Sequence, residues 1–496
     1  MEAQLREVIS DELRRRHGYG LMSSKIKPVH IANALLREEH QSLGRMADLK
    51  YLMRATANRE TAEDRLDAAR QMLERNRERW GRLGEDVDLR RSPLVTRVLP
   101  LLRTILGTDG AAFGSSPDWS SFSSPTALTV TKDASDEQAG AFVHRLWSGP
   151  TRLRLLDILR DLTSPQRDFS KVDDLTAVLI PLTDGTNPVR REERPETQAV
   201  PLSEVEECLR AAARDLASYE DKVLPNPMAT LQRIVLLASI SLFFHAATRA
   251  HECAGLPRRV LLLDASNSRT SVVADVSEAS VTALFNDARE YMARTLADSL
   301  TQPGAPGDAD RDWVSDPESA VAEMFRLRLG GGKVPNLREV VDVLDELGEG
   351  DGDVQAELPR RLVALLESGG GRSLDAFVRL LGIRAGLLYP QQKNPQKRLV
   401  PMDRTLEVLV AATFDLSGRP LEYRDFLDEL YRRWRIVVGG RLEDGQILAE
   451  ARTPVSSADL TENSERFLTR LQGLGLARKM ADSVAVVGLM ETNDVR

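Results

Sequence analysis

The sequence predicts a mainly helical, multidomain protein with a small central β element. The chain has 496 residues, whereas single hydrophobic cores stop growing at roughly 250 to 300 residues, so we expect several domains. Hydrophobic residues make up 42% of the chain, charged residues 29% and aromatic residues 5%. This composition favours a helix-rich globular protein over a disordered chain or a β-sandwich. The net charge of -8 repels nucleic acid, so any DNA contact requires a local basic surface.

Shifts in composition divide the chain into six predicted segments. Apolar residues recur at spacings of three and four before residue 90, and the run RETAEDRLDAARQMLERNRERWGR predicts a solvated, salt-bridged helix or an arm that packs on a partner. Two stretches rich in charge, Pro or Gly are predicted linkers. The segments are an N-terminal helical region (1–183), a linker (184–201), a central helical unit with a buried strand (202–301), a second linker (302–317), a helical region (318–390) and a C-terminal domain (391–496).

The central unit holds the longest apolar run of the chain. Residues 234–247 are fewer than the roughly 20 that a membrane span needs, and they predict a buried core helix over about 228–253. The run 259–263 predicts a buried strand, and Ser277 or Ser280 is expected to cap the helix that follows. The first residues mix acids with arginines and contain no apolar segment of a secretion signal. Two cysteines provide no disulfide framework, so we expect a cytoplasmic protein.

Two motifs could indicate a nucleotide-binding or metal-binding site. Gly330-Gly331-Gly332-Lys333 is followed by Val and Pro instead of Ser or Thr and a helix, which argues against a phosphate-binding loop. Asp264, Ser266 and Ser268 form an Asp-x-Ser-x-Ser pattern that resembles the metal-ion adhesion site of von Willebrand A domains. The alternating strands and helices of that fold do not follow. An Asx or Ser turn that closes a strand is therefore the favoured interpretation.

Nuclease and zinc chemistry lack complete residue sets. Asp118 and Lys132 have the spacing of a magnesium-dependent nuclease, but Val130 stands where a carboxylate is needed. His245 and His251 do not share a helical face with each other, so a core histidine is favoured over a zinc site with Cys253. We assign no catalytic residue, no metal and no cofactor. A non-enzyme is favoured, with a metal-dependent nuclease or phosphoesterase as the alternative.

The C-terminal hundred residues have the most readable pattern. A first helix around Leu406 is followed by an aromatic-rich helix over 423–434, a short strand at 436–438 that Gly439 and Gly440 end, and a loop. A third helix is predicted with Asp459 as its cap, Glu462 completing a capping box and Gly475 at its end. A hairpin follows, with residues 480–483 as its turn. This order of elements predicts a winged-helix domain.

A DNA-reading winged helix presents polar and basic side chains on its third helix and hairpin. The candidate DNA-binding residues lie on the third helix, on the hairpin and in the loop before the domain: Asn463, Arg466, Arg470, Arg478, Lys479, Lys393, Lys397 and Arg398. Glu462 and Glu465 lie among them and repel phosphates. DNA contact and protein docking therefore both remain open for this domain, and a transcriptional regulator is a further alternative.

The sequence is similar to accessory proteins of bacterial anti-phage gene clusters that are linked to DNA modification by phosphorothioation or methylation. The similarity lies in the buried helix followed by VLLLDASNSRTS, and in YRRWRIVVGGRLEDGQIL leading into NSERFLTRLQGLGLARK. It implies a non-catalytic scaffold or DNA-contacting subunit of a defence complex. The implied partners are a motor ATPase, a nuclease or a methyltransferase encoded nearby, together with duplex DNA. No active-site residue is implied.

Overall fold

A computed structural model describes most of the chain. The described residues are 2–20, 26–40, 42–44, 47–56, 63–83, 85–105, 130, 136–164, 177, 179–182, 186–188, 202–224, 226–266, 268–301, 315–329, 337–348, 353–368, 374–391, 396–413, 420–480 and 484–488. Within them the protein is mainly helical with a few short strands, which confirms the predicted helical class. Most of the predicted linker 302–317 and the segment with Asp118 and Lys132 lie outside these residues.

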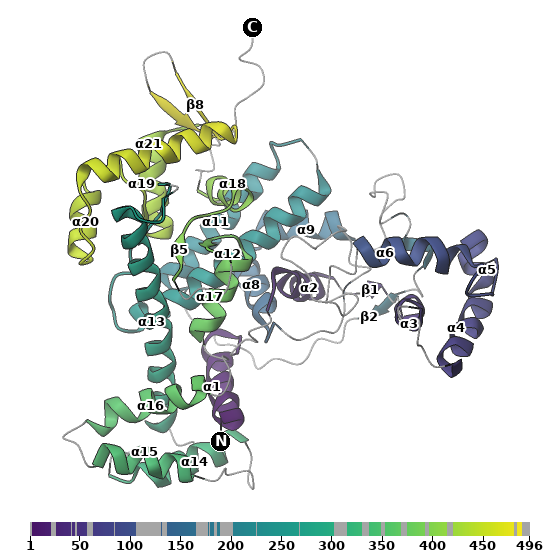
Figure 1. Cartoon of the computed structure of the whole chain (residues 1–496), viewed down its shortest axis with the longest axis horizontal. Coiled ribbons are helices and arrows are strands. Elements are labelled where there is room, and N and C mark those ends of the chain that lie inside the picture. The colour runs from purple at the N-terminus through teal and green to yellow at the C-terminus, as the bar shows by residue number, and fades with distance from the viewer. Residues whose placement is uncertain are drawn as a thin grey trace.

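Two long helices, α12 (Pro227–Cys253) and α13 (Val272–Thr301), form the centre of the main body (Figure 1). Other helices pack around this pair because it exposes apolar residues on several sides. They are α1 (Glu2–His17), α2 (Pro28–Glu39), α8 (Ala139–Ser148), α9 (Arg154–Thr163), α11 (Glu204–Glu220), α14 (Pro317–Leu329), α16 (Val354–Ser368) and α17 (Leu374–Arg384). Helix α15 (Arg338–Gly348) packs on α16.

Helix α12 confirms the predicted buried helix but is longer than its apolar run. Residues 227–249 are long and apolar enough to cross a membrane by length and composition alone. In the folded protein, however, 78% of the most apolar window is buried against neighbouring helices. Ser239, Ser241 and His245 are fully buried within this segment, and burial inside a protein core is what such a helix requires.

Polar side chains at helix starts explain where the central helices begin. Ser203 and Glu206 form a reciprocal capping box at the start of α11. The side chain of Asn226 accepts a hydrogen bond from Ala229 N at the start of α12. At α13 the predicted caps, Ser277 and Ser280, are wrong, because both residues lie within the helix. Ser271 is the residue whose hydroxyl accepts from the backbone, 3.1 Å from Ala274 N.

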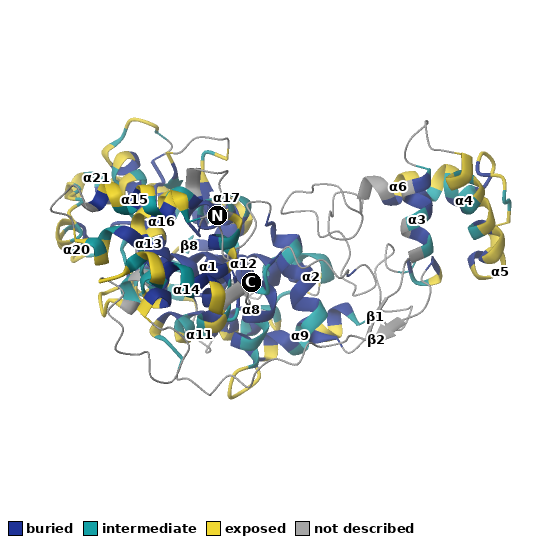
Figure 2. Cartoon of the chain, turned by 90° about the horizontal axis from the view of Figure 1, so that it is seen from below, coloured by how far each residue is buried: buried dark blue, intermediate teal, exposed yellow. Residues whose placement is uncertain are grey.

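A second, smaller hydrophobic core lies apart from the main body (Figure 2). We call residues 47–105 and 179–182 the satellite module. Leu49, Leu73 and Leu94 are fully buried in it, and Trp80 nearly so. Its elements are α3 (Ala47–Ala55), α4 (Glu63–Arg75), α5 (Arg77–Trp80), η1 (Gly81–Leu83), η2 (Leu94–Val98), α6 (Leu99–Ile105) and η5 (Ile180–Leu182). Beside it, β1 (Ser42–Gly44) pairs antiparallel with β2 (Thr186–Pro188), so part of the predicted linker 184–201 is a strand.

The C-terminal residues form a three-stranded sheet and four helices, which we call the C-terminal module. The helices are α18 (Asp403–Ala411), α19 (Tyr423–Trp434), α20 (Asp444–Glu450) and α21 (Ser457–Gly473). The sheet has the order β6-β9-β8, with both pairs antiparallel: β6 (Leu421–Glu422), β8 (Ala477–Lys479) and β9 (Ala485–Val487). The predicted second helix and the predicted hairpin strands are therefore present. The predicted loop before the third helix contains α20.

Strands also join the C-terminal module to the centre of the chain. The predicted central strand is β3 (Leu261–Leu262), and it pairs in parallel with β7 (Ile436–Val437). The antiparallel pair β4 (Leu388–Tyr389) and β5 (Arg398–Leu399) lies beside it, with a bridge between Leu263 and Leu399. Gly439 ends the β7 segment with φ of +105°, and a Cβ there would lie 2.2 Å from the Leu460 carbonyl oxygen.

One apolar core runs through all of the main body. It contains Leu5 from the first helix, Leu237 from α12, Phe377 from α17 and Phe467 from α21. These residues come from four of the predicted segments, so the core does not follow the predicted boundaries. The division of this body into several domains stays a prediction, because the largest core is continuous from Leu5 to Val487.

Candidate interaction site of the C-terminal module

Asn463 ties helix α21 to the central strand. Its amide nitrogen donates to the carbonyl oxygens of Leu263 and Val438 at 2.8 and 2.7 Å, and its oxygen accepts from Ala265 N at 2.8 Å. The side chain is 1% exposed. The prediction that Asn463 lies on the outer face of the helix is wrong. The residue instead satisfies three backbone groups where strands β3 and β7 end, and these groups are costly to bury unpaired.

The Asp264 pattern forms a turn with an arginine beside it. Asp264 Oδ1 accepts from Ser266 N at 2.8 Å and from Ser266 Oγ at 2.5 Å. Asp264 Oδ2 accepts from Arg398 Nη1 at 2.5 Å, and the same nitrogen donates to the Ser268 carbonyl oxygen at 2.6 Å. This geometry is the Asx turn that the sequence favoured over a metal site. The guanidinium supplies the positive charge that this nearly buried carboxylate needs.

Several of the other candidate DNA-binding residues also contact the protein itself. Arg466 donates to the Ser266 carbonyl oxygen and pairs with Glu462 at 2.5 Å. Arg470 pairs with Asp403 at 2.7 Å and donates to the Pro401 carbonyl oxygen at 2.6 Å. Lys397 is 1% exposed and donates to the Pro390 carbonyl oxygen, and its burial and the neighbouring Arg379 lower its pKa. A buried lysine is a poor phosphate ligand, so its predicted exposure is wrong.

Two of the three remaining candidates lie on the hairpin. Arg478 is half-buried on β8, and Lys479 is exposed at the end of that strand. Lys393 lies outside the described residues. Helix α21 and strand β5 thus bring Arg398, Asn463 and Arg466 together. The three side chains donate hydrogen bonds to the backbone carbonyl oxygens of Ser268, Leu263 and Ser266. Their grouping forms an internal clamp between distant parts of the chain.

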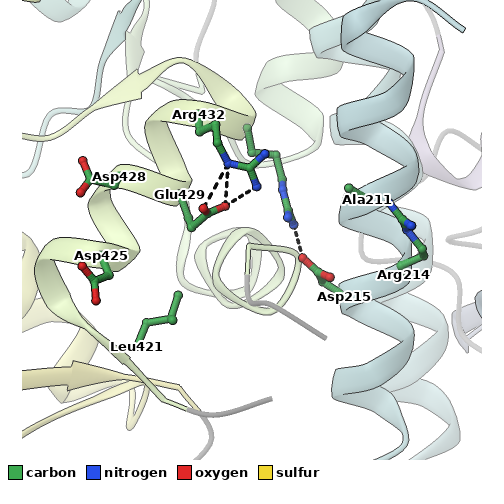
Figure 3. Close-up of a pocket in the computed structure, with 9 residues that line it drawn as sticks. Ala211, Arg214, Asp215, Leu421, Asp425, Asp428, Glu429 and Arg432 are labelled. Carbon is green, nitrogen blue, oxygen red and sulfur yellow. Dashed lines mark hydrogen bonds and ion pairs between the residues drawn. The ribbon is translucent and has the colours of Figure 1, made fainter. Parts of the chain in front are cut away.

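A groove separates helix α11 from helix α19 (Figure 3). It has a volume of about 590 Å³ and is lined mainly by charged side chains. At its base, the buried Arg433 and Asp215 form an ion pair that joins the two helices, and Arg433 also donates to the Ala412 carbonyl oxygen. Glu429 pairs with Arg432 along the wall at 2.5 Å. The contacts of Arg433 are structural, since they hold α19 against α11 and the end of α18, whereas the Glu429–Arg432 pair lies within α19.

The hairpin exposes apolar side chains. Met480 is 44% exposed and Val484 is 40% exposed. Met480 N donates to the Val484 carbonyl oxygen at 2.7 Å, so the two residues lie opposite each other across the hairpin. Leu474, at the end of α21, is 36% exposed. Neighbouring exposed apolar residues at the end of a projecting hairpin are a feature of protein contact surfaces.

Two histidines of the main body, His17 and His245, are part of its core. The Tyr19 hydroxyl lies 2.6 Å from His245 Nδ1, and the Tyr291 hydroxyl forms a hydrogen bond with His17 Nε2. Burial lowers the pKa of His17 and of His245. The core interpretation of His245 is therefore confirmed. Across the described ranges, no three His, Cys, Asp or Glu side chains are placed to hold a metal ion together.

Two structural features of the site were missed from the sequence. The pairing of β7 with β3 joins segments about 175 residues apart, and no local pattern encodes that distance. Ser456, not Asp459, caps α21, because its hydroxyl accepts from Asp459 N at 3.1 Å. The spacing Ser456 to Asp459 is itself a capping signal that the sequence contains.

Comparisons of the chain with known protein families, with characterised proteins and with solved structures gave no match.

Proposed function

We propose that this protein is a non-catalytic scaffold subunit of a bacterial phage-defence complex, and that its C-terminal module is a winged helix used for protein docking. The order α18, β6, α19, α21, β8, β9 supports the winged-helix assignment, as does the sheet in which β9 lies between β6 and β8. In this arrangement α21 takes the place of the recognition helix, and the β8–β9 hairpin is the wing.

The polar side chains of α21 mostly contact the protein itself, and this favours protein docking over DNA reading. A recognition helix that reads DNA needs free polar and basic side chains. Here Asn463 is buried in the clamp, Arg470 is paired with Asp403, and Arg466 is shared between Glu462 and a carbonyl oxygen. The wing exposes two apolar side chains, Met480 and Val484, and one cation, Lys479. Apolar anchors with little free positive charge fit a protein partner better than a phosphate backbone.

The cellular setting of the proposal comes from the resemblance to accessory proteins of DNA-modification-linked defence clusters. In that setting the protein acts in the cytoplasm beside a motor ATPase, a nuclease or a methyltransferase. The wing is then the part that contacts one of these subunits. The continuous core behind it holds the wing in a fixed orientation relative to the main body.

Co-purification of the full chain with the products of its neighbouring genes tests the proposal. We expect a stoichiometric complex on size exclusion with one of these subunits, and loss of that complex in the Met480→Glu/Val484→Glu variant. The control is Leu224→Glu/Leu256→Glu, which places the same charges at exposed apolar positions elsewhere, 89% and 52% exposed.

Two results contradict the proposal. The first is a complex that survives the wing substitutions. The second is cleavage of DNA by the purified protein with magnesium or manganese, which would favour the alternative of a metal-dependent nuclease. A sequence-selective footprint upstream of its own gene would instead favour a transcriptional regulator.

A further inference from the structure

The satellite module differs in charge from the rest of the protein. Residues 47–105 contain thirteen Arg and Lys and ten Asp and Glu, an excess of three positive charges. The whole chain carries -8, so the remaining residues carry -11. A basic region on an otherwise acidic protein concentrates any attraction for polyanions at one place.

Exposed arginines gather in one part of this module, which we call the arginine edge: Arg82, Arg90, Arg91 and Arg97. All four are exposed. The Ser92 hydroxyl donates to the Leu83 carbonyl oxygen at 3.4 Å, which brings the chain beside Arg82 next to the chain beside Arg91. Arg97 follows on η2, the helix that begins two residues after Ser92. The backbone beside Arg82 thus lies next to the backbone beside Arg91, and Arg97 follows six residues after Arg91 along the chain.

The arginine edge has few carboxylate partners. In the part of the chain that the structure describes, Arg82, Arg90 and Arg97 make no ion pair. Arg91 lies 3.7 Å from Asp88, a long contact. Such exposed pairs contribute little to stability.

Two of the three acids between Arg82 and Arg97 accept hydrogen bonds from the backbone, and the third, Glu85, is exposed. Asp86 Oδ1 accepts from Asp88 N at 2.9 Å, and Asp88 Oδ1 accepts from Arg90 N at 3.0 Å. Their carboxylates therefore form the turn between η1 and η2. The guanidinium groups around them remain available to a ligand.

We propose that the arginine edge binds the phosphate backbone of duplex DNA without sequence preference. Arginine forms paired hydrogen bonds with phosphate oxygens, and release of counterions drives such binding. A protein partner would need apolar anchors at the centre of its contact. None of the large hydrophobic residues that are strongly exposed in the described structure lies between 75 and 97, and Leu101 is the nearest. DNA contact and protein docking would then lie on different modules.

Fluorescence anisotropy with the full chain and a labelled 30-base-pair duplex of arbitrary sequence tests this inference. We expect binding at 50 mM NaCl that weakens steeply as salt is raised to 200 mM. The variant Arg82→Glu/Arg90→Glu/Arg97→Glu should lose at least about tenfold in affinity. Its slope of log affinity against log salt should fall by roughly three, since each lost phosphate contact removes about 0.9.

A charge-matched control distinguishes loss of the arginine edge from the change in the net charge of the protein. Arg214→Glu/Arg361→Glu/Arg424→Glu changes the net charge equally at exposed positions of the main body and should leave affinity within about twofold. Equal losses in both variants overturn the proposal, as does an absence of binding by the wild type at 50 mM NaCl. Circular dichroism of each variant checks folding, and the milder Arg→Gln triple should show the same ranking.

Polyglutamate distinguishes the two polyanion classes. If DNA occupies the edge, polyglutamate at equal charge concentration displaces the duplex weakly. Displacement as effective as that by unlabelled DNA overturns the assignment in favour of an acidic protein. These outcomes are separate from the co-purification test of the wing, because neither Met480 nor Val484 is changed.

Discussion

Two arginines beside the main core and those of the arginine edge have opposite surroundings. Arg433, on α19 of the C-terminal module, is buried against Asp215, and Arg398, on β5 beside that module, contacts the buried Asp264. In the satellite module, Arg82 and Arg90 are exposed and lack carboxylate partners within the described residues. The first module shares the main core, whereas the second has its own small core. A basic stretch of sequence therefore indicates a polyanion-binding surface only where its arginines lie outside a core and lack carboxylate partners.

The largest effect should come from the buried pair under the groove. Arg433→Ala leaves Asp215 charged and nearly buried without its partner, so we expect a loss of about 4 kcal/mol in the free energy of unfolding. Urea unfolding followed by circular dichroism measures it. The double variant Arg433→Met/Asp215→Leu should recover most of the loss. If Arg433→Ala unfolds at the wild-type urea concentration, the module is not held by this pair.

A core truncation in the satellite module should act locally. Leu73 is fully buried there, and Leu73→Ala should cost about 3 kcal/mol through lost contacts and a cavity. Because the two cores are separate, native-state hydrogen exchange should speed up in α3–α6 and stay unchanged in α12 and α13. Faster exchange throughout the main body would mean that the two cores unfold together.

Acid should weaken the main body before the satellite module. The folded state holds His17 and His245 neutral, because burial lowers the pKa of each. In the unfolded chain they take up protons below a pKa of about 6.5, so stability falls as the pH drops below that value. Each costs at most about 1.4 kcal/mol per pH unit, and His251 acts in the opposite direction because its hydrogen bond to Asp287 raises its pKa.

Thermal unfolding between pH 7 and pH 5 measures this loss. The variant His245→Asn should show a shallower pH dependence. Residues 47–105 contain no histidine, so the satellite module supplies an internal control. A melting temperature that stays constant over this interval would show that the two histidines take up protons in the folded state.

The smallest effect should come from the partly exposed pair of Arg470 and Asp403. Their side chains are 28% and 64% exposed, so Arg470→Ala should cost less than about 1 kcal/mol. Urea unfolding beside Arg433→Ala gives the comparison within one module. A loss as large as that of the buried pair would contradict the distinction between buried and exposed arginines.

Local sequence patterns predicted the main helices and the hairpin. The burial of the candidate site residues depends on contacts with residues far away in the sequence. Helix α12, helix α19 and the hairpin follow from apolar spacing and turn residues, which the sequence carries within a few positions. The burial of Asn463 depends on Leu263, two hundred residues away. Its polar side chain at a helical position is equally compatible with an outer face, so the sequence favoured the wrong side.

Helix α20 and the cap of α21 were predicted wrongly for a different reason. Helix α20 has seven residues and only one fully buried apolar side chain, Leu448, so its periodicity is too brief to detect. The capping residue of α21 was misplaced by three positions because Ser456 and Asp459 are both good caps. The turn at Asp264 was predicted correctly, since Asp followed by Ser after a strand favours it. The arginine that completes it lies 134 positions further along the chain.

The pairing of β3 with β7 has a consequence for synthesis on the ribosome. Leu261 and Leu262 emerge about 175 residues before Ile436 and Val437, their strand partners. During that interval the edge of the nascent body is open and its backbone groups are unpaired. An N-terminal fragment that ends between β4 and β5 should therefore expose this strand edge and require chaperones when it is made alone.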